Sequence, residues 1–325
     1  MDVSIIIVNW NSKQFLQDCI GSIERHTMGI AYEIIVVDSG SFDGCGEMLR
    51  AEFPHVRFIQ SDANIGFAGA NNLAYRSCNG RYLLFLNPDT ELVSAAVNMM
   101  LDHLQCHPDA GAVGCKLLNR DGSIQTSCIQ SFPTILNQLL NSELLRRLFP
   151  MALLWGMLPL FSLKAEPEKV EVVSGACVML RRSVFEQIGL FSEEYFMFAE
   201  DLDLCHKAMQ AGYTNHYLSW VTVRHFGGGS TDSAPSEFSV VMMRESIWRF
   251  LRKSRGVSYG SVYRLSTLLS AVARLALLVT LFPLQRAWHQ TPWPRNSIKK
   301  WLAILAWSLW IRRAPFPSQR HCSNP

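Results

Sequence analysis

The sequence predicts an α/β fold: an open, mainly parallel sheet with helices on both faces, followed by amphipathic, apolar C-terminal helices. Short apolar runs rich in β-branched residues, at 5–8, 33–37 and 81–86, are typical of buried parallel strands. Their spacing leaves room for a helix between successive strands. Ligands of such sheets bind at the carboxyl ends of the strands, so functional residues are expected immediately after each run.

The remaining elements follow from local patterns. Apolar residues at helical spacing predict helices over 13–25, 45–52 and 68–76, and Ser12 is expected to cap the first. A further strand is expected at 56–60. The second half predicts one strand at 172–180, a short helix at 181–188, and a helix from residue 200 that ends at Gly212.

Composition divides the chain into two parts. It has 325 residues, a net charge of +3 and 49% hydrophobic residues, which excludes an extended disordered protein. Residues 244–325 alone carry a net charge of +13 and six of the nine tryptophans, whereas residues 1–243 carry −10. A basic, Trp-rich segment favours an anionic membrane surface over a nucleic acid. The nine cysteines form no CxxC pair, which favours the reducing cytosol, and the N-terminus is not typical of a cleaved signal peptide.

Polar clusters end three of the expected strands. They are Asn9-Trp10-Asn11, residues 38–44 (DSGSFDG), and Asn87-Pro88-Asp89-Thr90. One such cluster alone would be an ordinary turn, but three on neighbouring parallel strands converge on one edge of the sheet and favour a site. Residues 64–72 (NIGFAGANN) offer amides and close backbone approach to a nucleotide. They lack the GxGxxG spacing of a dinucleotide-binding loop, so an NAD-dependent oxidoreductase is disfavoured.

Three acids open the helix expected at residue 200, namely Glu200, Asp201 and Asp203. The helix dipole alone favours one acid there by about 0.3–1 kcal/mol. Three acids reached through the aromatic run 195–198 (YFMF) indicate carboxylates at the edge of a pocket instead.

From Ser4 to Phe226 the sequence resembles the inverting family 2 glycosyltransferases of GT-A fold, in particular the rhamnosyltransferase-like branch that acts on bacterial cell-surface polysaccharides. The motifs that carry this resemblance are the three strand ends together with Asn64-x-Gly66, Ser174-Gly175-Ala176, Glu200-Asp201-x-Asp203 and His225. The resemblance implies a nucleotide-sugar donor and a catalytic domain over 1–255. It leaves 256–325 as a membrane-associating tail.

The resemblance also implies residue roles. The nucleotide would be bound by Val8, Asn9, Asp38, Asn64, Gly66, Asn72 and Asn87. Residues 87–89 stand where the family has its DxD metal motif, but Asn87 replaces the first Asp and is a poorer cation ligand. Asp89 and His225 would therefore hold Mg²⁺ or Mn²⁺, which suits a diphosphate leaving group. Asp201 would be the catalytic base, with Glu200 and Asp203 positioning it or the acceptor.

The tail predicts contact with a membrane. Residues 265–284 reach the minimum length of a spanning helix, yet Arg264, Thr267, Ser270 and Arg274 form a polar stripe that favours a helix lying in the interface, with its basic residues toward lipid phosphates. Residues 298–311 are too short to span, and 135–163 could form an acceptor-side lip. A buried helical hairpin is the alternative.

The resemblance implies an enzyme that moves a sugar from a nucleotide donor to a lipid-linked saccharide, and its rhamnosyltransferase-like branch implies L-rhamnose from dTDP-rhamnose. With the basic tail, we expect this enzyme at the cytoplasmic face of the bacterial inner membrane, peripheral or monotopic. A UDP-sugar donor is the nearest alternative. A non-catalytic nucleotide-binding membrane adaptor is the other, and Asn87 is its main support. No nucleic-acid partner is expected.

Overall fold

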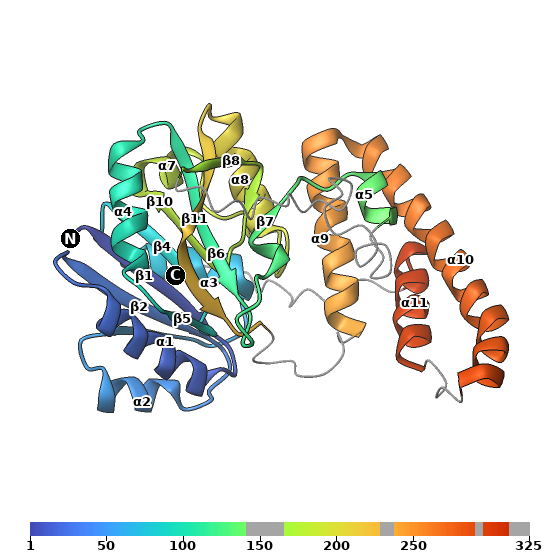
Figure 1. The fold of residues 1–325 in the computed structure, drawn as a ribbon, viewed down its shortest axis with the longest axis horizontal. Coiled ribbons are helices and arrows are strands. Elements are labelled where there is room, and N and C mark those ends of the chain that lie inside the picture. Colours follow the sequence, from blue (N-terminus) through green and yellow to red (C-terminus); the bar gives the residue numbers. More distant parts are fainter. Residues whose placement is uncertain (141–165, 228–236, 290–294, 312–325) are drawn as a thin grey trace, which may run out of the picture. The chain divides into compact units, whose positions relative to one another are not determined.

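The computed structural model describes residues 1–140, 166–227, 237–289 and 295–311, which fall into two compact units (Figure 1). The first, called here the α/β unit, comprises residues 1–132, 147–196 and 200–230. The second, the helical unit, comprises residues 133–146, 197–199 and 231–325. The helical unit therefore includes residues that precede position 256.

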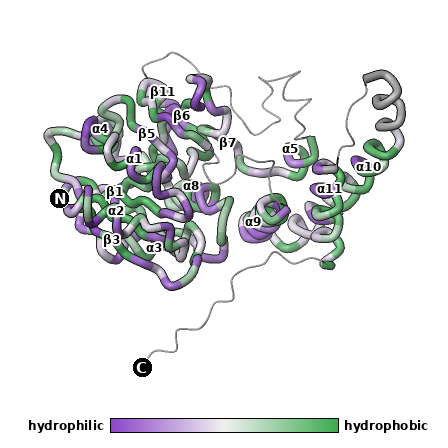
Figure 2. The backbone as a smooth tube through the Cα atoms, turned by 90° about the horizontal axis from the view of Figure 1, so that it is seen from below, coloured by the Kyte–Doolittle hydropathy of each residue, from purple (hydrophilic) through white to green (hydrophobic). Residues whose placement is uncertain are grey.

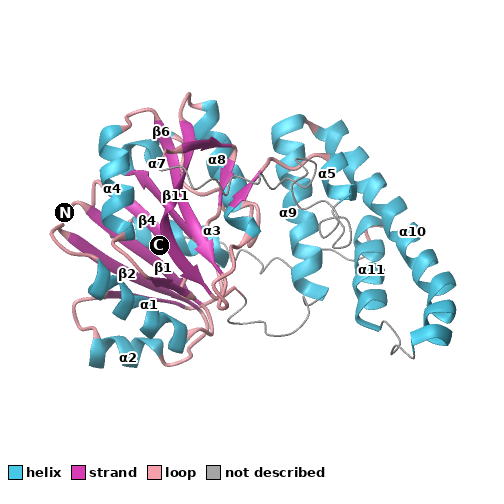
Figure 3. Cartoon of the chain, viewed as in Figure 1, coloured by secondary structure: helices cyan, strands magenta, loops and turns pink. Residues whose placement is uncertain are grey.

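The α/β unit is built on a nine-stranded mixed sheet (Figure 3). Its order is β3-β2-β1-β4-β10-β6-β11-β5, and β8 also pairs with β11. The strands are β1 (Val3–Asn9), β2 (Tyr32–Ser39), β3 (Arg57–Ser61), β4 (Tyr82–Leu86), β5 (Thr90–Leu92), β6 (Ala110–Leu118), β8 (Glu168–Val170), β10 (Cys177–Arg181) and β11 (Thr214–His225).

The first four strands of the sheet are parallel, as the sequence predicts. β1 pairs with β2 and β4, and β2 pairs with β3, all in parallel register. Every residue of β1 is buried, which explains its unbroken apolar, β-branched composition. β10 runs antiparallel to β4 and β6, and β5 runs antiparallel to β11.

One predicted strand divides in two. Residues 172–180 form β9 (Val172–Val173), which pairs with β7 (Ile129–Gln130), and β10, which joins the main sheet. The turn at 174–176 separates them, because the Cys177 amide donates to the Ser174 carbonyl. The small residues of this segment mark a change of partner rather than a continuous strand.

The helices of the α/β unit lie close to their predicted positions. They are α1 (Lys13–His26), α2 (Cys45–Glu52), α3 (Gly66–Tyr75), α4 (Ala96–Cys106), α7 (Arg182–Gln187), α8 (Glu200–Gln210) and the 3₁₀ turn η1 (Thr126–Cys128). Ser12 occupies the N-cap position of α1 but bonds to the Trp10 carbonyl, and Asp43 accepts the Lys13 amide in its place. Gly212, with φ of +89°, follows α8 in a Schellman turn, as expected.

The helical unit contains α5 (Ile135–Leu140), α9 (Glu237–Arg255), α10 (Val257–His289) and α11 (Arg295–Ser308). Buried Val240, Ala271 and Ile304 bring α9, α10 and α11 together, and the Trp307 indole donates to Glu245 at 2.9 Å. Most of the expected lip at 135–163 lies outside the described residues.

The polar stripe of α10 faces the interior of the helical unit, so the prediction that its basic residues point toward lipid is wrong. Arg264 is buried among tryptophan rings and donates to the carbonyls of Trp307 and Ser308. Arg274 lies over Trp301 and donates to the Leu139 carbonyl at 3.2 Å. The guanidinium groups bond to carbonyls at helix ends, which need donors.

Apolar side chains occupy the exposed face of α10 instead. They are Val262, Leu265, Leu269, Val272, Leu277 and Val279, each at least half exposed. Figure 2 shows the hydrophobic character of this helix. Among the described residues, α10 is the one helix long and apolar enough to cross a membrane, over Val257–Thr280.

Candidate active site

The polar ends of β1 and β2 meet in the structure. Asn9 and Asp38 are register partners at the ends of these parallel strands, and the Asn9 amide donates to Asp38 Oδ1 at 2.9 Å. The same Asn9 nitrogen lies 3.1 Å from Asp43 Oδ2 and 3.3 Å from Cys45 Sγ. The predicted convergence of strand ends is therefore present.

Asp38 organises the loop that follows β2. Its carboxylate accepts hydrogen bonds from Asn9, Gln60 and the amides of Ser41 and Phe42. Burial raises its pKa, but these donors outweigh burial and leave the pKa below its ordinary value. Asp38 is fully buried, and the hydrogen bonds that its oxygens accept shape this loop.

Asp38, Asp43 and Cys45 are spaced closely enough to hold a metal ion. The amide nitrogen of Asn9, which carries two hydrogens, lies within hydrogen-bond distance of all three. Asp43 also accepts the backbone amides of Lys13 and Cys45, at the starts of α1 and α2. These acceptors are satisfied without a cation, so this group is a structural network that joins two helices to the strand ends.

Two exposed aromatic residues flank this network, and sequence reasoning gave them no role. Trp10 is 46% exposed and Phe42 is 65% exposed. Phe42 has a φ of +52°, and Asn11, which follows Trp10, has a φ of +51°. A positive φ costs free energy in residues other than glycine. Exposed rings on a braced, strained loop are suited to contact a planar base. The signal available in sequence was an aromatic residue inside two of the three polar clusters.

The segment at 64–72 packs against the loop that precedes α8. Asn64 Oδ1 accepts the Gly66 amide at 3.0 Å and the Ser39 hydroxyl at 3.3 Å. Gly66 has a φ of +74°, and a Cβ there would lie 2.3 Å from the Phe196 carbonyl oxygen. The glycine is therefore required for contact between two protein loops.

Asn72 is a correction to its expected role as a nucleotide ligand. It is buried, its amide donates to the Phe191 carbonyl and to Glu193, each at 2.9 Å, and its oxygen accepts the Phe191 amide. All of these bonds hold the loop before α8. Asn72 thus braces that loop. Val8 is a buried strand residue paired with Val37, and the role expected for it is one of its backbone, which this burial does not alter.

Asp89 and His225 lie side by side although 136 positions separate them. β11 ends antiparallel to β5, which places His225 opposite Thr90, and the Phe226 amide donates to the Asp89 carbonyl. His225 Nε2 is then 3.2 Å from Asp89 Oδ1 and 3.4 Å from Asn87 Nδ2. Both side chains of the Asp89–His225 pair are largely buried, at 13% and 15% exposure.

This pair fits a small divalent cation. A carboxylate oxygen and an imidazole nitrogen are suitable ligands for Mn²⁺, and a carboxylate suits Mg²⁺. Ligands that share one such cation lie about 3 Å apart, since each bond is about 2.1 Å long. Asn87, the departure from the family pattern, stands next to the pair as a neutral amide. Gln125, which no sequence motif indicated, contacts His225 at both its ring and its backbone.

Glu200 and Asp201 begin α8, as expected, and their immediate surroundings differ. Asp201 Oδ2 accepts the Gly175 amide at 3.1 Å, and Oδ1 accepts the Leu202 amide. Burial raises the pKa of Asp201 above its ordinary value despite these donors. Burial, and then the charge of Asp201, raise the pKa of Glu200 to about 8. Glu200 Oε2 is buried with no hydrogen-bond partner in the described structure.

Asp203 does not face the site, so its expected role there is corrected. It is 1% exposed, accepts the Ser192 hydroxyl at 2.6 Å and forms an ion pair with Lys207 at 3.3 Å. Tyr195 also donates to it. Asp201 and Asp203 are two positions apart on the helix, so their side chains point in nearly opposite directions, and Asp203 points to the interior and anchors the 192–195 loop.

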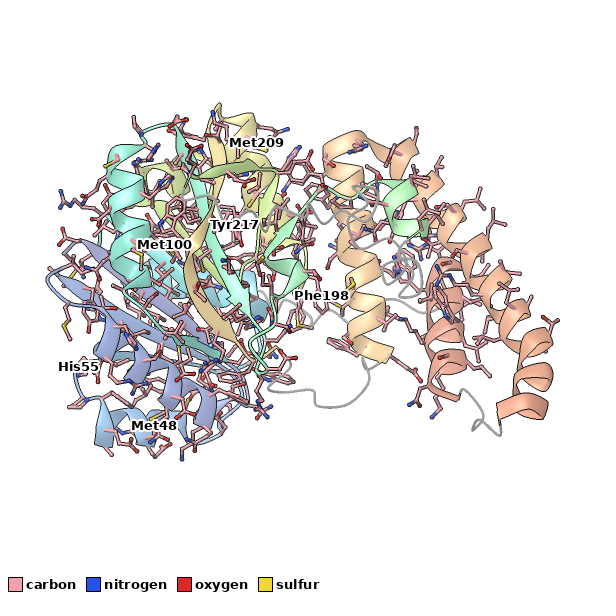
Figure 4. All side chains as sticks on the ribbon, viewed as in Figure 1. Met48, His55, Met100, Phe198, Met209 and Tyr217 are labelled. Atoms are coloured by element: carbon pink, nitrogen blue, oxygen red, sulfur yellow. The ribbon has the colours of Figure 1, made fainter. Side chains whose placement is uncertain are left out.

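Backbone contacts join the two halves of the site. The Asn87 amide donates to the Ala176 carbonyl at 2.9 Å, and the adjacent Gly175 amide holds Asp201. A Cβ on Gly175 would lie 3.3 Å from the Asp201 Cβ, so the Ser174-Gly175-Ala176 motif gives Asp201 its space. Phe198 and Ala199, directly before Glu200, both have positive φ, near +70° and +65° (Figure 4). Strained backbone of this kind is concentrated at functional sites.

This α/β sheet, with an Asp/His pair at its edge and a buried carboxylate at the start of α8, has the GT-A fold of glycosyltransferases. The sequence model of Glycosyl transferase family 2 matches residues 4–189. The chain belongs to this family, and this confirms the resemblance carried by its motifs.

Relatives and solved structures agree with this assignment. The N-acetylglucosaminyl-diphospho-decaprenol L-rhamnosyltransferase of Mycobacterium tuberculosis (strain ATCC 25618 / H37Rv) is 28% identical over 220 residues, which are 62% of this chain and 69% of the relative. Rhamnosyltransferase WbbL of Escherichia coli (strain K12) is 24% identical over 274 residues, 82% and 98% of the two chains. The mannosyltransferase PcManGT from Pyrobaculum calidifontis, solved with GDP-Man and Mn²⁺, shares the fold with a TM-score of 0.59, at 16% identity, over 96% of this chain and 88% of that one.

Proposed function

We propose that this protein transfers L-rhamnose from dTDP-rhamnose to a lipid-linked saccharide, with inversion at the anomeric carbon and with the help of a divalent cation. The observation that carries the proposal is the joint placement of the Asp89–His225 pair and Asp201, tied together through the Asn87–Ala176 and Gly175–Asp201 bonds. A leaving-group site and a base site on one rigid sheet edge are what a direct displacement needs.

The residues supply the following steps. Asp201 accepts the proton of the acceptor hydroxyl as its oxygen forms a bond to the anomeric carbon. The bond from that carbon to the diphosphate oxygen breaks, and its electron pair leaves with the diphosphate. Asp89 and His225 would hold the cation, whose chemistry is to neutralise charge on the diphosphate. No enzyme nucleophile is required, so one displacement inverts the centre.

The raised pKa of Asp201 supports its role as the base, because a stronger base accepts a proton more readily. Glu200, with a pKa of about 8, carries a proton at pH 7, so it is not the group that takes the proton of the acceptor. The two carboxyl groups therefore divide the roles between them. This division follows the general pattern of adjacent acids whose surroundings separate their pKa values.

The choice of sugar and acceptor rests on the relatives. Two of them carry names that specify rhamnosyl transfer, one with a decaprenol-linked acceptor. A lipid-linked acceptor also fits the apolar face of α10, and we place the enzyme at the cytoplasmic face of the inner membrane. Thermal unfolding with dTDP, UDP or GDP, each with Mn²⁺, distinguishes the base, because the ligand that binds raises the midpoint.

Membrane attachment is proposed through apolar contact supported by charge. On the described helices of the helical unit, the basic residues seen to be exposed are Arg252, Lys253, Arg255, Lys299 and Lys300. The described helices of this unit contain two acids, Glu237 and the buried Glu245. Apolar burial combined with basic flanks is the usual composition of a helix in the membrane interface.

The test of the reaction is Asp201→Asn in the full chain. It retains shape and removes basicity, so turnover of dTDP-rhamnose should fall by about 10² or more while donor binding persists. Asp18→Asn, exposed on α1, is the matched control and should retain activity. NMR of the product gives the anomeric configuration. Near-normal turnover in Asp201→Asn together with an inactive Glu200→Gln would assign the base to Glu200.

A further inference from the structure

Gln125 contacts His225 through both ends of its side-chain amide. Its Nε2 lies 2.7 Å from the His225 carbonyl oxygen, and its Oε1 lies 2.8 Å from His225 Nδ1. Gln125 belongs to the segment between β6 and η1, 100 positions from the histidine in the chain. Its own backbone amide is fixed by the Leu117 carbonyl at the end of β6.

These two contacts determine the orientation of every group involved. The His225 carbonyl can only accept a hydrogen bond, so the amide nitrogen of Gln125 must face it. The amide oxygen then faces the ring, and because that oxygen can only accept, Nδ1 must carry a hydrogen. In the neutral imidazole, Nε2 is left without a hydrogen and presents a lone pair.

That lone pair faces the proposed cation ligands. Nε2 is 3.2 Å from Asp89 Oδ1, and the Asn87 amide nitrogen approaches it at 3.4 Å. A bare nitrogen beside a carboxylate oxygen places two electron-pair donors together, the arrangement that a cation between them would satisfy. The same arrangement would be lost if Nδ1 were bare and Nε2 carried the hydrogen.

We propose that Gln125 is a positioning residue that locks His225 in the Nδ1–H tautomer, so that Nε2 is available to a divalent cation together with Asp89. This inference rests on the proposed function, because it concerns the same cation site. Outer residues that hold the second ring nitrogen of a ligand histidine commonly change metal affinity by about 10- to 100-fold when altered. Nothing in the local sequence distinguishes Gln125 from other loop glutamines.

Two substitutions distinguish control of the His225 tautomer, which depends on the bond to the ring, from simple support of the His225 backbone. Gln125→Leu removes both bonds. Gln125→Glu keeps an oxygen that can accept the Nδ1–H bond but removes the donor to the His225 carbonyl. If the ring bond matters, Gln125→Glu should bind Mn²⁺ as tightly as wild type or more tightly, and Gln125→Leu should bind about 10- to 100-fold more weakly. Gln14→Leu, exposed on α1, is the control and should bind normally.

The experiment uses the full-length protein without nucleotide. Mn²⁺ alone is titrated and followed by electron paramagnetic resonance, with Asp89→Ala as the variant that should not bind. In parallel, the tautomer is read without metal from long-range ¹H–¹⁵N spectra of ¹⁵N-histidine protein, with the His225 signals identified by their loss in His225→Gln. Wild type and Gln125→Glu should show the Nδ1–H form. Gln125→Leu should shift toward Nε2–H.

The outcomes are distinct. If the His225 ring of the wild-type protein carries its hydrogen on Nε2, the proposed role of Gln125 is wrong. This result does not depend on whether any variant folds. Equal Mn²⁺ affinity of Gln125→Leu and wild type, or equal losses in Gln125→Leu and Gln125→Glu, also overturns that role while leaving the Asp89–His225 site in place. If the wild-type protein does not bind Mn²⁺, the cation site of the proposed function is wrong. The proposed effect of Gln125 on cation binding is then wrong as well.

Discussion

Glu200 and Asp201 are adjacent at the start of α8, and burial raises the pKa of both. The pKa of Glu200 is about 8 in the folded protein and near 4.5 when unperturbed. Between these pH values the folded protein retains a proton that the unfolded chain has lost. Stability therefore declines as pH rises from about 4.5 to 8.

Glu200→Gln removes this decline, because glutamine does not ionise. The difference in unfolding midpoint between the variant and wild type should therefore favour the variant more at pH 8.5 than at pH 5. The change in this difference should be about 2–4 °C for each kcal/mol of unfolding free energy that the ionisation of Glu200 removes. Thermal unfolding at the two pH values measures it. Glu47→Gln, exposed on α2, is the control and should show the same difference at both. An equal difference for Glu200→Gln at both pH values would contradict the raised pKa.

At the scale of elements, β11 carries a histidine near each of its ends. Its C-terminal end carries His225 into the site, and near its start His216 Nδ1 lies 2.9 Å from His103 Nε2 on α4. The rings of His103 and His107 stack with centroids 4.0 Å apart. Burial, followed by the neighbouring histidines, lowers the pKa of His103 to about 4, and burial also lowers that of His216.

This cluster should make the protein acid-sensitive. A histidine whose folded pKa is depressed binds its proton more readily when unfolded, so stability is lost as pH falls from about 6.5 toward 4. The urea midpoint of wild type should fall across this range, and His103→Gln should reduce the fall. His55→Gln, on an exposed surface (Figure 4), is the comparison and should leave it unchanged. An unaltered pH dependence in His103→Gln would show that the pair does not control acid sensitivity.

For the whole molecule, the helical unit is not a tail that begins at residue 256. Trp307 donates to Glu245 of α9, and Trp248 packs edge-on against Trp310, so α9 shares its core with α10 and α11. Residues 197–199 belong to the same unit, and the Ser246 hydroxyl donates to the Met197 carbonyl at 2.9 Å. The helical unit therefore holds the strained residues that lead into Glu200.

The exposed apolar face of α10 should bind the enzyme to lipid. Replacing Leu265, Leu269 and Val272 by Gln should lower binding to anionic phosphatidylglycerol vesicles by 10-fold or more, since each buried side chain contributes about 1.5–3 kcal/mol. Co-sedimentation measures it. Much of the wild-type binding should persist at about 1 M NaCl, because salt screens charge and not apolar burial.

The matched control replaces three exposed apolar residues of the α/β unit, Met28, Val93 and Met209, by Gln. It should bind vesicles like wild type, and both triple variants should keep the wild-type unfolding midpoint because the altered side chains are at the surface. Binding that vanishes in high salt and ignores the α10 variant would assign the attachment to the basic residues alone.

The sequence by itself determined the order of the elements, the parallel strands β1 to β4, the strand-end clusters and the family. These depend on local periodicity and on motifs read within short segments. Only the tertiary structure decided which polar residues reach the site. Asp38, Asn72 and Asp203 have the residue types of ligands, but donors from distant segments occupy their oxygens. Arg264 and Arg274 belong to a polar stripe whose helical period is visible in the sequence. The direction in which this stripe faces depends on the backbone carbonyls of other helices that accept hydrogen bonds from the two arginines. Gln125 reaches His225 because β6, which holds the Gln125 amide at Leu117, pairs with β11, and such long-range pairing leaves no local signal.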